Sequence, residues 1–234
     1  MARGELGVVD KVLKNFTQKK PSRPNKILKT LQGVSKDDFD PQTEADRSSQ
    51  QCIVASLTKQ YSNLKIIGEE GVTDLTNVPK EFIVDSSDEK FLENFKCPEQ
   101  YKNIAESDLV VWVDPLDGTS EYLHGFLEHV TILIGISFRE SAIGGIIHQP
   151  YFKCSTSGKL GRTIWGVKDL GTGGFTGKKA PENKFIITTT RSHSNALVQT
   201  TLDSIRPDEV IRVGGCGFKV LQVRFKGNLL DIFY

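Results

Sequence analysis

The sequence predicts a layered protein of mixed α and β structure, in which strands and helices alternate along the chain. Short apolar runs typical of buried strands recur, as in LVVWV at 109–113. Segments whose apolar residues have helical spacing lie between these runs. HVTILIGISF and SAIGGIIH flank Arg139-Glu140 and predict a β-hairpin. Alternation of this kind is typical of sheets that are covered by helices.

The individual elements follow from local patterns. A helix is expected at 47–61, because Ile53, Leu57 and Tyr61 are spaced at i, i+4 and i+8. A strand is expected at 109–113, ended by Asp114-Pro115, because proline cannot donate to a sheet ladder. The other expected strands cover 64–68, 129–138, 141–148, 184–190, 209–213 and 229–234, and the other expected helices cover 89–95, 195–205 and 218–225.

Composition is that of an ordinary globular protein, with 38% hydrophobic and 25% charged residues in 234. No apolar run approaches the roughly 18 residues of a membrane helix, and no signal peptide is recognised. A cytoplasmic location and no membrane partner are therefore expected. The four cysteines form no CxxC pair and the four histidines form no HExxH pair. A zinc site or a disulfide scaffold is therefore not expected.

Positive charge is concentrated at the beginning of the chain. Residues 1–32 contain eight Lys or Arg and two Asp or Glu, whereas the net charge of the whole chain is only +1. Such a segment can bind nucleic acid, but it has few aromatic residues and contains Pro21 and Pro24. A flexible, solvated arm without a nucleic-acid partner is expected.

Acidic residues cluster at the ends of three expected elements. Asp46 ends DPQTEAD before a helix, Glu69 lies in GEEG after a strand, and Asp114 and Asp117 lie in DPLDGT after LVVWV. Each cluster has an ordinary structural interpretation, as a helix N-cap, a solvated glutamate or a tight turn. DPLDGT also delivers two carboxylates and a hydroxyl to one turn, which suits Mg²⁺ and phosphate-ester hydrolysis. From the residues alone, a metal site and a structural turn both stay open.

Longer motifs add a family resemblance. WVDPLDGTSEY, GEEG and TEAD occur in the order found in the inositol monophosphatase-like superfamily, which the chain resembles from about residue 33 onward. LGRTIWGV, IITTTRSHSN and RVGGCGFK resemble its 3'(2'),5'-bisphosphate nucleotidase branch. The resemblance implies a layered α-β-α-β-α sandwich of the sugar and inositol phosphatase type.

The resemblance also implies roles for particular residues. The metal ligands would be the side chains of Glu69, Asp114 and Asp117 and the carbonyl of Leu116. Asp46 and Thr119 would activate or position the attacking water. The positions that match nucleotide-binding residues are Thr190, His193, Gly215 and Lys219. A lysine provides a point charge for phosphate, and a glycine permits close backbone approach.

The sequence departs from the family pattern at both ends. The family has a further metal-binding aspartate in a Trp-Asp motif beyond the glycine-rich segment, but neither Trp112 nor Trp165 precedes an aspartate. The family's long first helix is also not recognised. A C-terminally truncated form, incomplete at both ends, is therefore expected. Its parts would be a basic segment (1–32), a metal-binding α+β domain (33–150) and a partial nucleotide-binding α/β domain (151–234).

The implied activity is Mg²⁺-dependent and lithium-sensitive hydrolysis of the 3'-phosphate of adenosine 3',5'-bisphosphate, giving AMP and phosphate. 3'-Phosphoadenylyl sulfate and inositol 1,4-bisphosphate are further expected substrates. Two alternatives stay open: a catalytically impaired remnant that binds nucleotide or metal, and an inositol phosphate phosphatase. The sequence does not indicate an oligomeric state.

Overall fold

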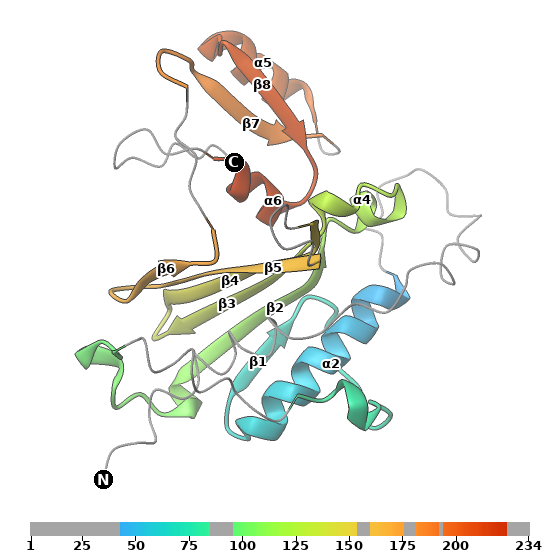
Figure 1. Ribbon diagram of the computed structural model, residues 1–234, viewed down its shortest axis with the longest axis vertical. Helices are drawn as coiled ribbons and strands as arrows, with labels where there is room; N and C mark the ends of the chain where they lie inside the picture. The colour runs from blue at the N-terminus through green and yellow to red at the C-terminus, as the bar shows by residue number, and fades with distance from the viewer. Residues whose placement is uncertain (1–42, 85–95, 154–159, 176–180, 192–193, 224–234) are drawn as a thin grey trace.

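The computed structural model describes residues 43–84, 96–153, 160–175, 181–191 and 194–223 (Figure 1). Its main feature is a six-stranded sheet of order β1-β2-β3-β4-β5-β6. β1 is parallel to β2, and the remaining neighbours are antiparallel. The strands are β1 Lys65–Gly68, β2 Leu109–Asp117, β3 Thr131–Phe138, β4 Ser141–Lys153, β5 Leu160–Val167 and β6 Gly171–Gly173.

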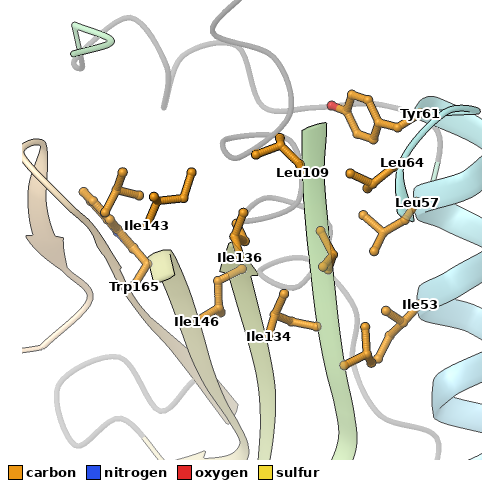
Figure 2. Close-up of a cluster of buried hydrophobic side chains, with 13 residues drawn as sticks. Ile53, Leu57, Tyr61, Leu64, Leu109, Ile134, Ile136, Ile143, Ile146 and Trp165 are labelled. Atoms are coloured by element: carbon orange, nitrogen blue, oxygen red, sulfur yellow. The ribbon is translucent and has the colours of Figure 1, made fainter. Parts of the chain in front are cut away.

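The helix α2, Glu44–Gln60, covers one face of this sheet (Figures 1 and 2). It begins at the N-cap Thr43, whose side chain and that of Asp46 form a reciprocal capping box. Ile53 and Leu57 pack against the apolar residues of the sheet, including Val111, which is fully buried. The helix expected at 47–61 is thus confirmed, beginning one turn earlier because of the cap.

The expected hairpin is present as β3 and β4. Arg139 and Glu140 have φ angles of 46° and 65°, the left-handed conformation that two-residue hairpin turns of type I′ require. β4 is longer than expected, and β5 and β6 extend the sheet. Sequence analysis did not predict β5, although LGRTIWGV forms it, because Gly161 and Gly166 weaken its strand pattern.

The prediction that β2 ends at Asp114-Pro115 was wrong. The strand continues to Asp117, with a register shift between Asp114 and Asp117 against β3. Proline is tolerated within a sheet at such a bulge, because no ladder N–H is needed there. The bulge lies at the point where the acidic motif leaves the sheet.

A second, two-stranded parallel sheet contains β7, Ile186–Thr190, and β8, Glu209–Val213. The helix α5, Ala196–Ile205, connects them and is capped by Asn195. The helix α6, Cys216–Gln222, begins two residues before the expected position and contacts both β3 and β7, so it lies between the two sheets (Figure 1). The mixed α and β class is confirmed.

Short elements complete the described chain. The helix α4 spans Thr119–Leu123, and single 3₁₀ turns cover Lys80–Phe82 (η2), Glu99–Tyr101 (η3), Glu106–Asp108 (η4) and Leu127–His129 (η5). Within the described ranges no helix is long and apolar enough to cross a membrane. The expected helix at 89–95, strand at 229–234 and arm at 1–32 lie outside the described residues.

Candidate active site

The acidic motif after β2 lies against the start of α2. The hydroxyl of Thr119 donates hydrogen bonds to Asp46 Oδ1, at 3.0 Å, and to the carbonyl of Leu116, at 3.2 Å. Gly118 makes the turn into α4 with φ at 86°. The structure therefore brings together Asp46, Leu116 and Thr119. Asp46 and Thr119 are 73 residues apart in the sequence.

Asp46 is held from both sides. Its Oδ2 accepts the backbone N–H of Thr43 at 2.7 Å and the Thr43 hydroxyl, while Oδ1 faces Thr119. The residue is 1% exposed. The capping interaction fixes one oxygen of the carboxylate, so the other oxygen can act on the Thr119 hydroxyl.

Glu69 reaches the site because β1 and β2 are parallel and end at the same edge of the sheet. Its N–H donates to the carbonyl of Val113 at 2.9 Å. Gln50 of α2 holds the loop that follows, because its amide oxygen accepts the N–H of Glu70 at 3.0 Å and its Nε2 donates to Gly71 O at 3.1 Å. A second donation reaches the Thr73 hydroxyl at 2.9 Å. This role of Gln50 was not predicted from the sequence, because a polar side chain gives no local sign that it is buried.

Asp114 lies among other carboxylates. Burial, followed by the negative charges of Asp117 and Glu69, raises the pKa of Asp114 to about 8. A hydrogen bond with the Glu69 side chain acts in the same direction. The end of β2 thus carries more negative charge than the surrounding protein groups stabilise, which is the electrostatic environment that a bound cation relieves.

Asp117 is engaged differently. Its Oδ1 accepts the N–H of Cys216 at 2.7 Å, and its Oδ2 accepts the N–H of Gly217 at 2.8 Å and the hydroxyl of Thr131 at 2.5 Å. Across the described residues, no group of three His, Cys, Asp or Glu side chains converges closely enough to hold a metal ion. Both oxygens of Asp117 thus have protein donors, from α6 and from β3.

The expected nucleotide-binding positions lie beside this turn. Gly215 has φ at 73°, and a Cβ there would come within 2.8 Å of the His129 carbonyl and 3.1 Å of Asp117 Oδ2. Lys219 lies one turn into α6, with its N–H bonded to Gly215 O at 3.2 Å. Thr190 ends β7 and pairs with Val213, just before the glycines. His193 lies outside the described residues.

Comparison with known proteins identifies the family of this chain. A model of the inositol monophosphatase family matches residues 7–225. The chain belongs to the inositol monophosphatase family. It is 51% identical to human "3'(2'),5'-bisphosphate nucleotidase 1" over 79% of this chain and 60% of that protein. The chain thus spans 60% of the length of this curated relative.

Solved structures of the family share the fold. The "extragenic suppressor protein suhB" of Bartonella henselae superposes with a TM-score of 0.54 at 18% identity, over 82% of this chain and 64% of that one. An "IMPase/NADP phosphatase complexed with Mg2+ and phosphate" gives a TM-score of 0.50 at 18% identity, over 81% and 60% of the two chains. At this identity the likeness shows the fold.

The inositol monophosphatase family uses divalent metal ions. In this member, the oxygen donors at the end of β2 fit a hard cation in their chemistry, because carboxylates and a carbonyl are the ligands that Mg²⁺ takes. The burial of Asp114 beside the carboxylates of Asp117 and Glu69, which raises its pKa, supports this fit. Glu69, Asp114 and the Leu116 carbonyl are the donors whose surroundings favour a cation.

One further acidic residue of this family member, Glu121, was not predicted from the sequence. Glu121 lies in α4 and is 1% exposed. Its Oε2 accepts His129 Nδ1 at 2.8 Å and is also hydrogen-bonded to the Arg191 guanidinium. Its position in DPLDGTSEY was the available signal, but no local pattern shows that a glutamate in the first turn of a short helix is buried.

Proposed function

We propose that this chain carries the active site of a Mg²⁺-dependent phosphomonoesterase that removes the 3'-phosphate of adenosine 3',5'-bisphosphate, giving AMP and phosphate. The observation that carries the proposal is the bond between Thr119 Oγ1 and Asp46 Oδ1, 3.0 Å long, beside the charged cluster of Asp114. A hydroxyl held by a carboxylate can take part in moving a proton from water. The name of the human relative supports the choice of substrate.

The roles divide between two groups of residues. We assign Glu69, Asp114, Asp117 and the carbonyl of Leu116 to holding Mg²⁺, which when bound would activate water and neutralise phosphate charge. Thr119 orients the attacking water through its hydroxyl. Asp46 accepts the hydrogen bond of Thr119 and keeps that hydroxyl directed toward the turn. Inhibition by Li⁺, through occupation of a magnesium position, belongs to the same proposal.

The nucleotide would lie against the start of α6. Gly215, with its φ of 73° and no side chain, lets the backbone before α6 pack closely against His129 and Asp117, which would place this segment beside the bound phosphate. Lys219 supplies positive charge for a phosphate. Thr190 and His193 would contact the nucleoside side. 3'-Phosphoadenylyl sulfate and inositol 1,4-bisphosphate belong to the proposed substrate range, and the cytosol is the proposed location.

A second candidate function is binding of nucleotide or metal without turnover. The saturation of Asp117 by Cys216, Gly217 and Thr131 favours it, because these donors compete with a metal ion for the same two oxygens. In this candidate the site would retain ligand affinity while the reaction is lost. The two candidates differ in whether phosphate is released.

Phosphate release from adenosine 3',5'-bisphosphate by the purified chain is the test. We expect release with Mg²⁺, none with EDTA, and a loss of at least about a hundredfold in Asp114→Asn, because that change removes a charged ligand. Asp108→Asn, at an exposed site, is the matched control and should behave as wild type. Binding of AMP without any phosphate release would refute the first candidate and support the second. Faster release from inositol 1-phosphate than from the nucleotide would reassign the substrate.

A further inference from the structure

The buried carboxylate of Glu121 joins parts of the chain that are distant in sequence. Glu121 belongs to α4, directly after the acidic turn, and is 1% exposed. Its Oε2 accepts hydrogen bonds from His129, 8 residues on, and from Arg191, 70 residues on. Among the residues that the structure describes, its Oε1 has no hydrogen-bond partner. Burying a carboxylate oxygen without a hydrogen-bond partner costs folding free energy, which suggests that the Glu121 side chain serves a purpose other than stability.

Each of the two partners is also fixed by a ring. The Arg191 guanidinium lies 3.9 Å from the centroid of Phe126. The His129 ring stacks on Phe218 of α6, with centroids 4.4 Å apart and planes at 26°. The side chain of Glu121 therefore connects α4 to the residue after β7 through Arg191, and to α6 through His129.

These connections lead to the segments proposed to hold the nucleotide. Arg191 follows Thr190 directly, and its N–H donates to the Val213 carbonyl at 3.1 Å. The His129 carbonyl lies so close to Gly215 that a Cβ there would be 2.8 Å away. Gly214 is pressed against Glu121 itself, because a Cβ on Gly214 would come within 2.1 Å of Oε1. Both segments are thus packed onto one carboxylate.

Within the described part of the chain, the Glu121 carboxylate makes no hydrogen bond with Thr119 or Asp46, the pair proposed to position water. The bond between Thr119 and Asp46 instead joins the acidic turn to α2. Loss of the Glu121 charge would therefore release Arg191 and the glycine segment while leaving Thr119 and Asp46 in contact. This separation predicts an effect on substrate affinity rather than on the chemical step.

We propose that Glu121 is a positioning residue that acts through Arg191 and His129 to fix the nucleotide-binding segments relative to the acidic turn. The inference rests on the proposed function and deepens it. It names the residue that makes the enzyme prefer a nucleotide substrate to a phosphate ester without a nucleoside. Charge-assisted hydrogen bonds in a buried site are strong enough for this role.

The test compares two substrates: adenosine 3',5'-bisphosphate and glycerol 2-phosphate, which has no nucleoside. Glu121→Gln and Arg191→Met should each raise KM for the nucleotide by about tenfold or more, since each removes a charge-assisted bond. The turnover number should change less than about threefold, and kcat/KM for glycerol 2-phosphate should stay near wild type. The double variant should lose no more than Glu121→Gln alone, because Arg191→Met removes one of the two interactions that Glu121→Gln weakens.

A matched control and a rescue complete the design. Arg139→Met removes another arginine that stacks on a phenylalanine, at 4.9 Å from the centroid of Phe138, in the turn between β3 and β4. It should leave both substrates unaffected. Arg191→Lys keeps the charge beside Glu121 and should recover part of the affinity that Arg191→Met loses. Circular dichroism and the melting temperature verify that each variant is folded.

The outcomes separate the two proposals. If Glu121→Gln weakens hydrolysis of both substrates equally, or if the double variant shows additive losses, the positioning role is wrong. Calorimetric titration with AMP gives an independent measure: equal affinity in the wild type and Glu121→Gln would also overturn it. A wild-type chain that neither hydrolyses the bisphosphate nor binds AMP would instead overturn the proposed function.

Discussion

The carboxylate of Asp117 accepts a hydrogen bond from the N–H of Gly217 at 2.8 Å, although 100 residues separate the two. Gly217 can approach so closely because it has no side chain. A Cβ at that position would come within 2.5 Å of both Thr131 Oγ1 and Leu133 Cδ2. The first turn of α6 is thereby seated on the ends of β2 and β3, which connects the glycine-rich segment to the acidic motif.

Gly217→Ala should therefore destabilise the protein by about 1–3 kcal/mol, the usual cost of overpacking, despite the higher helix propensity of alanine. Urea unfolding measures the change in the free energy of unfolding. Gly145→Ala is the matched control, because a Cβ there meets only the Ile134 carbonyl at 3.5 Å, an ordinary contact. Equal stability of the two variants would mean that α6 is not seated as described.

The Thr119 hydroxyl provides a second prediction. Thr119→Val keeps the shape of the side chain but removes the bonds to Asp46 and Leu116. We expect turnover on adenosine 3',5'-bisphosphate to fall about a hundredfold or more, as is typical for loss of a proton-transfer group, whereas Thr119→Ser should retain most of it. Steady-state kinetics at saturating Mg²⁺ distinguishes the two variants.

Thr200→Val serves as the control for that experiment. The Thr200 hydroxyl also donates to a backbone carbonyl, that of Ala196 at 2.9 Å, but it is exposed on α5. Its loss should leave turnover unchanged. Wild-type turnover in Thr119→Val would show that the bond to Asp46 only stabilises the helix cap.

Gln50 leads to a third prediction, which concerns metal affinity. Gln50→Leu removes the three hydrogen bonds that hold the loop carrying Glu69, at a cost of about 1–3 kcal/mol. The rise in melting temperature on adding Mg²⁺ should also shrink, because a tenfold weaker site forfeits about 1.4 kcal/mol of ligand stabilisation. Thermal melts across a Mg²⁺ titration give both quantities.

Gln60→Leu separates the two effects, because Gln60 is on the same helix but donates to the Val84 carbonyl at 2.8 Å. This variant should lower the melting temperature while keeping the full Mg²⁺ response. If both glutamine variants keep the full response, the loop does not position a metal ligand.

The sequence predicted those elements of the fold in which a short apolar pattern determines the outcome. The helical spacing of Ile53 and Leu57, the hairpin at Arg139-Glu140 and the strand β8 were all found. The continuation of β2 past Pro115 was not predicted, because a bulge depends on the partner strand rather than on the strand's own residues. For the same reason the weak pattern of β5 becomes a strand only when paired with β4.

Only part of the candidate site could likewise be predicted from the sequence. DPLDGT and GEEG indicated the acidic residues, and the structure places Thr119 against Asp46. The partners of Glu121 were not predictable, because they come from positions 8 and 70 residues away. Burial of a polar side chain such as Gln50 is decided by what packs over it, and no local pattern encodes that.

A fourth prediction concerns pH and lies away from the site. His148 in β4 accepts or donates a bond with Thr163 Oγ1 at 2.8 Å, and burial lowers the pKa of His148 from 6.5 to about 4. Between these values the unfolded chain binds a proton that the folded chain does not, so stability falls as pH falls through this window. A shift of this size corresponds to at most about 3 kcal/mol.

Urea unfolding between pH 7 and pH 4 should thus show a shallower loss of stability in His148→Gln than in the wild type. Carboxylates titrate in the same range in both proteins, so only the difference between the two curves reports on His148. His124→Gln is the matched control, since His124 is exposed and its ring is hydrogen-bonded to the nearby Ser120 of α4. We expect the two curves of unfolding free energy against pH to converge toward pH 4. Parallel curves for the wild type and His148→Gln would instead show that protonation of His148 does not oppose folding.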